Sequence, residues 1–212
     1  MTEIAQGMRA SATRDAILEA AQERLLADGF ARLSTRGVAA SAGVPLSQVH
    51  YHFGSKQQLI LELLEVENNR RLTRQKGMFA EDVPLWVRYE QACDFLEDDL
   101  DSGYVRILQE MIALGWSDAV VGAKVRDIVS GWFSLLVDVA REVEARYDGA
   151  LGPFTAVEVA ALIAQVFYGG EAMLLLGFER RQWPVRSSLR RIGVLIRAFE
   201  ERGAGDASSG AG

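Results

Sequence analysis

Residues 33–64, LSTRGVAASAGVPLSQVHYHFGSKQQLILELL, constrain the fold more than any other part of the chain. Thr35 can cap a short helix, and Gly43 can end it because glycine adopts the left-handed turn conformation at little cost. The inward residues of this helix are small enough for another helix to cross closely: Val38, Ala39 and Ala42. A second helix follows Pro45, so the stretch predicts a helix, a short turn and another helix.

The second predicted helix, about residues 45–53, has two distinct faces when its residues are placed 100° apart. Val49 and Phe53 point inward. The outward face carries hydrogen-bonding side chains: Ser47, Gln48, His50 and Tyr51. Short or planar donors and acceptors suit base edges and phosphates in a DNA major groove, whereas a merely soluble helix would usually present Lys and Glu.

A third helix of this region begins after Gly54. Ser55 and Gln58 have the spacing of a capping box, and Lys56 lies in the first helical turn. The unpaired amide groups of that turn, with the lysine beside them, predict a phosphate-binding site.

These elements together resemble the tetracycline-repressor (TetR) family of bacterial transcription regulators. The resemblance covers about residues 12–64 and rests on RDAILEAAQERLLADGF, LSTRGVAASAGV and HYHFGSKQQL at fixed spacings. It implies base-reading roles for Arg36, Ser47, Gln48 and His50, and phosphate contacts for Thr35, Tyr51 and Lys56. The chain departs from the family at two positions. It has Pro45 where the family often has a Ser or Thr that caps the recognition helix, and His50 where the family often has the first of two aromatic residues.

The rest of the chain predicts an all-α protein. Its 212 residues are 49% hydrophobic, enough to bury a sizeable core in one domain or two. Apolar residues recur three and four positions apart, and no alternating strand pattern interrupts them. The further helices are expected near residues 11–28, 55–79, 84–100, 103–115, 118–147, 155–178 and 185–202.

The predicted organisation has three parts. Residues 1–54 form the helix-turn-helix DNA-binding domain, residues 55–202 an effector-binding and dimerisation domain, and residues 203–212 a disordered tail with little apolar surface. The polar stretch ENNRRLTRQKG, near the end of the helix from Ser55, suggests an exposed rod that joins head to body. The lone Cys93 excludes an internal disulfide and fits a cytoplasmic location, and the N-terminus lacks a secretory signal.

Residues 156–178 are apolar on nearly every side. Their length allows a membrane span, but Gln165 and Glu171 favour a helix buried on both faces, against its own domain and against a partner. We therefore predict a homodimer and no membrane partner. The expected interface residues lie on this helix and on the last one: Val166, Phe167, Leu189, Ile192, Ile196 and Phe199.

The resemblance also implies an effector pocket in the body. Candidate lining residues are aromatic, with a few others among them: Trp86, Tyr89, Tyr104, Glu110, Met111, Trp116, Trp132 and Phe133. The same side chains could equally be ordinary core, because aromatic residues at helical spacing usually just pack. A pocket of this composition would bind an unknown, largely apolar small molecule.

An enzyme is poorly supported by the sequence. The only two histidines, His50 and His52, lie in the predicted DNA-reading helix, so catalytic, metal and cofactor sites are not expected. The acidic run at Asp98, Asp99 and Asp101 is either a metal or acid–base cluster or, more often for such runs, a solvated surface.

The combined prediction is a homodimeric regulator that binds a palindromic operator in double-stranded DNA and is released by the effector. Repression is the family's usual action. The alternatives are a transcriptional activator of the same family, or a helical dimer that binds a small molecule or protein without DNA.

Overall fold

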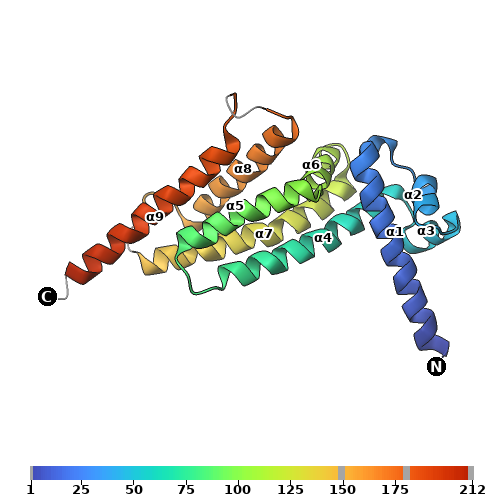
Figure 1. Cartoon of the computed structure of the whole chain (residues 1–212), viewed down its shortest axis with the longest axis horizontal. Helices are drawn as coiled ribbons and strands as arrows, with labels where there is room; N and C mark the ends of the chain where they lie inside the picture. The colour runs from blue at the N-terminus through green and yellow to red at the C-terminus, as the bar shows by residue number, and fades with distance from the viewer. Residues whose placement is uncertain (1, 148–150, 179–181, 210–212) are drawn as a thin grey trace. The chain divides into compact units, whose positions relative to one another are not determined.

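The computed structural model describes residues 2–147, 151–178 and 182–209, and within these ranges the fold is all-α, as predicted (Figure 1). Nine helices follow one another in the described ranges, and no strand occurs there: α1 Thr2–Arg32, α2 Thr35–Ser41, α3 Leu46–Phe53, α4 Lys56–Phe79, α5 Leu85–Asp101, α6 Tyr104–Gly115, α7 Ala119–Arg146, α8 Ala156–Leu175 and α9 Val185–Ser209. Helix ends lie close to the expected positions from α2 to α7, whereas α1 begins earlier than predicted and α9 ends later.

The described chain forms two compact units. The first extends to Asn69 and includes Arg106–Val125, whereas the second combines Arg70–Val105 with the chain from Arg126 onward. Helix α6 and the first turns of α7 therefore pack in the same unit as the predicted DNA-reading helices. The domain boundary between residues 54 and 55, which the sequence suggests, stays a prediction.

In the first unit, α1, α2 and α3 pack around a common core that includes Ile17, Leu25, Val38 and Val49, all nearly inaccessible. Gly29 breaks α1, as expected for a terminator, with φ 76° and ψ 164° inside the helical stretch. Such a φ is costly for any residue with a Cβ, so glycine is required at this kink.

The helix caps correct two expectations. Ser34, not Thr35, caps α2: its backbone is extended, and its Oγ accepts a hydrogen bond from Gly37 N at 3.1 Å. Ser55 Oγ likewise accepts from Gln58 N at 3.1 Å, but the reciprocal half of the expected box is missing, because the Ser55 amide donates to Phe53 O. At α8 the full box of Thr155 and Glu158 is present.

In the second unit, α9 packs along α5, and α7 packs against α8. The Tyr89 hydroxyl donates to Leu189 O at 3.1 Å, and Gly193 lets the two helices approach, since a Cβ there would lie 3.3 Å from the Tyr89 ring. The core between α7 and α8 contains Leu136, Val137, Ala160 and Ala164.

Helix α8 buries only one face within the described chain. Phe167 and Glu171 lie on the buried face, whereas Leu162 and Val166 are each 47% exposed. By length and composition α8 is the one described helix that could cross a membrane. The face of α8 that its own chain leaves uncovered therefore carries apolar side chains, which is a feature of interaction surfaces.

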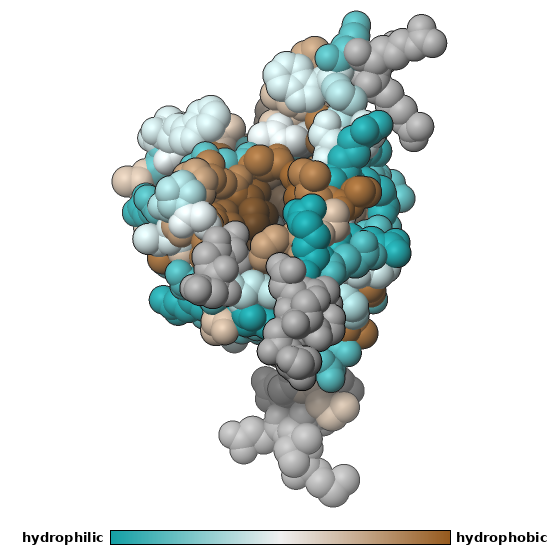
Figure 2. All heavy atoms as spheres, turned by 90° about the vertical axis from the view of Figure 1, so that its left-hand side faces the viewer, coloured by the Kyte–Doolittle hydropathy of each residue, from teal (hydrophilic) through white to brown (hydrophobic). Residues whose placement is uncertain are grey.

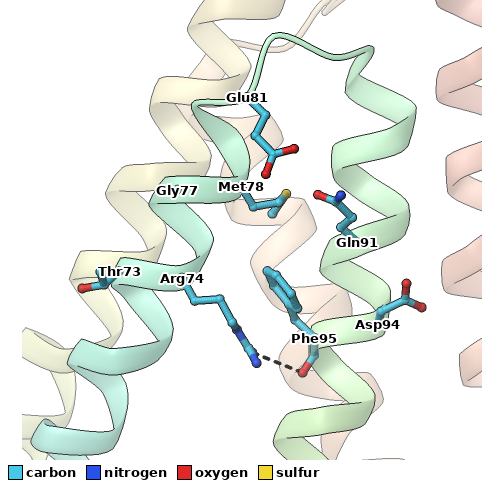
Figure 3. Close-up of a pocket in the computed structure, with 8 residues that line it drawn as sticks. All are labelled: Thr73, Arg74, Gly77, Met78, Glu81, Gln91, Asp94 and Phe95. Carbon is cyan, nitrogen blue, oxygen red and sulfur yellow. Dashed lines mark hydrogen bonds between the residues drawn. The ribbon is translucent and has the colours of Figure 1, made fainter.

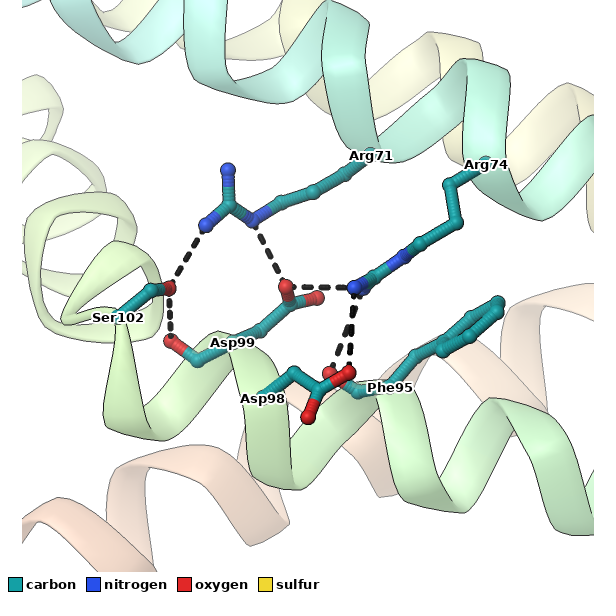
Figure 4. A network of polar contacts seen from close by, with 6 residues as sticks. All are labelled: Arg71, Arg74, Phe95, Asp98, Asp99 and Ser102. Carbon is teal, nitrogen blue, oxygen red and sulfur yellow. Dashed lines mark hydrogen bonds and ion pairs between the residues drawn. The ribbon is translucent and has the colours of Figure 1, made fainter.

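An ion-pair network joins α4 to α5 (Figure 4). Arg71 Nε and Arg74 Nη2 lie 2.8 and 2.9 Å from Asp99 Oδ1, and Arg71 Nη2 donates to Ser102 Oγ at 2.7 Å. Burial raises the pKa of Asp99, although both guanidinium groups act to lower it. The acidic run is therefore not simply a solvated surface, and the polar stretch of α4 is tied to α5 rather than wholly exposed.

The backbone of residues 203–209 continues α9, although the sequence predicted a tail from residue 203. Residues 210–212 lie outside the described residues, so disorder at this end of the chain stays a prediction.

Candidate nucleic-acid interface

Helix α3 presents the polar face that its sequence pattern predicts. Pro45 stands at the N-cap with an extended backbone, and Gly54 ends the helix with φ 72°. Val49 and Phe53 are buried in the core of the first unit, and their burial fixes the rotation of the helix about its axis. The opposite face must then point to solvent.

The four candidate DNA contacts of α3 lie on or beside that outward face. Tyr51 is 79% exposed, Ser47 and His50 are exposed, and Gln48 is half-buried. His50 Nδ1 lies 3.0 Å from Gly54 O, which orients the imidazole. A neutral ring that donates from Nδ1 keeps Nε2 as an acceptor for a base or phosphate donor.

Helix α2 adds the other two candidates of the reading element. Arg36 is exposed, and Thr35 is half-buried at the first helical position. Arg24 of α1 supports this helix from below: its guanidinium bonds to Asp28, and a Cβ on Gly37 would lie 3.0 Å from Arg24 Nε. A side chain larger than that of glycine at position 37 would therefore have to displace the Arg24 guanidinium.

Lys56 is not simply exposed at the start of α4. Its Nζ donates to Phe30 O at 2.9 Å and lies 4.2 Å from the centre of the Phe30 ring. An ammonium group has three donors, so two remain for a phosphate. Lys56 thus holds the end of α1 whether or not it also contacts DNA.

Two residues of α6 complete the support of the kink in α1. Arg106 Nη1 donates to Leu26 O, and Glu110 Oε2 accepts from Phe30 N, each at 2.9 Å. This role was not predicted from the sequence, which places Glu110 among the candidate residues of the effector pocket. Two local features of the sequence could have indicated this role: an Arg and a Glu four residues apart, and a glycine at a helix break.

Further contacts join α4 to the turn between α6 and α7. Gln57 Nε2 donates to Asp118 Oδ2 at 3.0 Å, while Asp118 Oδ1 accepts from the amides of Val120 and Val121. These hydrogen bonds lower the pKa of Asp118, and the one from the Val121 amide contributes most. Asp118 therefore caps α7 and ties α4 to it.

The proposed pocket residues divide between the two units. In the first unit Met111 is fully buried and Trp116 is 83% exposed. In the second, Tyr89 and Tyr104 are buried, Trp86 lies under Arg197, and Trp132 and Phe133 flank the core between α7 and α8. A groove of about 420 Å³ between α4 and α5 is lined by none of the eight candidates.

Aromatic packing in the second unit centres on Trp132. Its ring lies edge-on to Phe167 at 5.8 Å and to Tyr168 at 5.3 Å. Burial raises the pKa of the Tyr168 hydroxyl well above its ordinary value. Apolar side chains also gather in a hollow on the face that Figure 2 shows.

The expected dimer residues do not all face outward. Phe167 and Leu189 are buried by the chain itself, and Ile192, Ile196 and Phe199 are half-buried. The four candidates on α9 form an apolar stripe that faces α5. The large apolar residues that α9 exposes are instead Val194 and Leu195. Of the six candidates, Val166 alone is exposed in the described chain.

Acidic, histidine and cysteine side chains do not gather into a metal site: no group of three or more is found among the residues that the structure describes.

Comparisons with known proteins agree with this geometry. Residues 17–63 match the sequence model of the bacterial regulatory proteins of the tetR family. A comparison with curated proteins found no match.

Solved structures share the fold. FadR from Bacillus subtilis, in complex with stearoyl-CoA, is 13% identical with a TM-score of 0.71, over 85% of this chain and 96% of FadR. A TetR-family regulator from Rhodococcus sp. is 20% identical with a TM-score of 0.70, over 88% of this chain and 98% of that one. Salmonella enterica GusR is 20% identical with a TM-score of 0.67, over 87% of this chain and 94% of GusR.

The fold and the outward polar face of α3 define a helix-turn-helix, DNA-binding transcription regulator. The DNA-binding part of the chain, residues 17–63, belongs to the TetR family of bacterial regulatory proteins, and the chain as a whole has the fold of TetR-family transcriptional regulators.

Proposed function

We propose that the protein is a homodimeric repressor that binds a palindromic operator through α3 and is released by a small, largely apolar effector. The observation that carries the DNA-binding part is the exposed polar face of α3, where Ser47, His50 and Tyr51 stand opposite the buried Val49 and Phe53. A helix so oriented can enter the major groove with its polar side chains against the base edges.

Within this interface, Arg36, Ser47, Gln48 and His50 read bases, and Thr35, Tyr51 and Lys56 contact phosphates. Arg36 is exposed on α2, the helix that packs against α3, which supports its assignment. Planar groups such as those of arginine and glutamine make paired hydrogen bonds with one base, so they carry more sequence information than phosphate contacts.

Dimerisation uses α8 and α9. The exposed apolar residues Leu162 and Val166 on α8, and Val194 and Leu195 on α9, support this assignment. Exposed apolar side chains concentrated on two neighbouring helices mark a protein interface. A two-fold dimer presents two α3 helices to two half-sites, and this symmetry matches that of a palindrome.

The effector binds in the second unit beside the aromatic residues of α5, α7 and α8. The edge-on cluster of Trp132, Phe167 and Tyr168 supports an apolar ligand. The FadR structure holds stearoyl-CoA, which contains a long apolar chain, so a fold of this kind accommodates such a group. The protein acts in the cytoplasm, without a metal or cofactor.

The test is a gel-shift titration with DNA from upstream of the protein's own gene, compared with scrambled DNA of the same length. We expect a shifted complex with the upstream DNA at concentrations that leave the scrambled DNA free. Fatty acyl-CoA compounds of several chain lengths would then be added to the complex. Equal binding of both DNAs would reject an operator in that region, and a complex that resists every acyl-CoA would exclude this class of effector.

A further inference from the structure

The groove between α4 and α5 is built like a ligand site (Figure 3). Its volume is about 420 Å³, within the range of roughly 300–1,000 Å³ typical of small-molecule sites. Met78, which is buried, and the ring of Phe95 provide apolar surface. Gly77 leaves one wall open, since no atom lies within 4 Å of the position that a Cβ would occupy.

Two polar atoms in this lining are buried and have no hydrogen-bond partner among the described residues: Arg74 Nε and Gln91 Oε1. Buried acceptors are nearly always paired in native proteins, because an unpaired one has lost its water without gaining a donor. Figure 3 shows the Gln91 amide directed toward Met78, inside the groove. A ligand that donates a hydrogen bond to Gln91 would restore the missing interaction.

The charges around the groove favour a cation. The terminal nitrogens of the Arg74 guanidinium pair with Asp98 and Asp99, so its charge is already balanced. Asp94, on the rim, pairs with Arg190. The Glu81 carboxylate has no hydrogen-bond or ion-pair partner among the described residues, and Figure 3 shows it at the same end of the groove as Gln91, near Met78.

We propose that this groove binds a small organic ammonium compound. The ammonium group donates to Gln91 Oε1 and to the Glu81 carboxylate, while the apolar part of the ligand packs on Met78 and Phe95. These residues lie on α4, on α5 and, for Glu81, in the connection between the two helices, and none belongs to the effector or dimer residues proposed above. The site is additional to those functions and does not depend on them.

The experiment uses the full chain with isotope-labelled methionine methyl groups, followed by NMR. The chain has five methionines, and Met78→Leu identifies the Met78 signal. Benzylamine, protonated at neutral pH, should shift that signal saturably, with a dissociation constant of about 1 mM, as expected for so small a ligand. Benzyl alcohol, which is neutral, and benzoate, which is negative, match its size and should bind at least about tenfold more weakly.

Two variants and one control complete the test. Gln91→Leu and Glu81→Gln should each weaken benzylamine binding by at least about tenfold. Asp82→Asn removes a neighbouring exposed carboxylate that does not line the groove, so binding should not change. The proposal is overturned if the Met78 signal does not respond to benzylamine, if benzyl alcohol binds equally well, or if the Asp82 variant loses as much affinity as the Glu81 variant.

Discussion

The carboxylate of Glu110 accepts a hydrogen bond from the backbone amide of Phe30, at 2.9 Å across 80 positions of sequence. An unbroken helix would pair that amide with Leu26 O, but Gly29 interrupts the ladder. Arg106 donates to Leu26 O instead. The Arg106–Glu110 ion pair of α6 thus supplies partners to both groups that the kink in α1 separates.

Glu110→Ala should lower the free energy of unfolding by about 1.5–3 kcal/mol, the usual range for a hydrogen bond to a charged group. Glu110→Gln keeps an acceptor for the Phe30 amide and should lose less. Urea denaturation measures both, and the double variant with Arg106→Ala shows whether the two side chains act as a unit. Unchanged stability of the alanine variant would mean that solvent replaces the carboxylate at no cost.

Lys56→Ala tests whether the ammonium that binds Phe30 O also reaches DNA. A phosphate contact predicts weaker operator binding and a log affinity versus log salt line that is less steep by about one unit. Lys76→Ala, at the exposed far end of α4, is the matched control. Weaker binding with an unchanged slope would assign Lys56 to positioning of α1 alone.

Gln48→Ala should reduce discrimination at one base pair of each half-site by about 1–3 kcal/mol. Tyr51→Phe should instead weaken binding to all operator variants alike, because a phosphate contact carries no sequence information. Binding to a set of single-base operator variants separates the two patterns. A uniform loss for Gln48→Ala would move that residue to the DNA backbone.

Leu195→Glu should dissociate the dimer, because it places a charge on the exposed apolar face of α9. Ser187→Glu is the control on the same helix, exposed but outside the apolar set. Sedimentation velocity measures the oligomeric state of both variants. A dimeric Leu195→Glu variant would place the interface on another surface.

Acidification should weaken the pair between Arg88 and Glu142. A hydrogen bond from Arg88 lowers the pKa of Glu142, so the pair stabilises the fold above the ordinary glutamate pKa of about 4.3. That contribution is lost as pH falls below this value and through the lowered pKa. Glu142→Gln should flatten this part of the stability curve, measured by thermal unfolding from neutral to acidic pH, and an identical pH dependence in both proteins would contradict the assignment.

Much of the fold followed from local signals. The bounds of α2 to α7 lie close to the predicted ranges, because glycine, proline and helical spacing act within a few residues. The two faces of α3 were predictable for the same reason, since the burial of Val49 and Phe53 sets the direction of every other side chain on the helix. The capping box at Thr155 is equally local.

The sequence by itself determined the helices, their faces and the DNA-reading element, because these depend on spacing along the chain. Only the tertiary structure decided which distant side chains meet: Lys56 and Glu110 at Phe30, Asp99 between two arginines, and the apolar stripe of α9 against α5 rather than outward. An amphipathic pattern indicates that one face of a helix is buried but not which element covers it, because the hydrophobic effect has no directional preference. The choice of neighbour depends on shape and on paired polar groups, which are set when the helices pack.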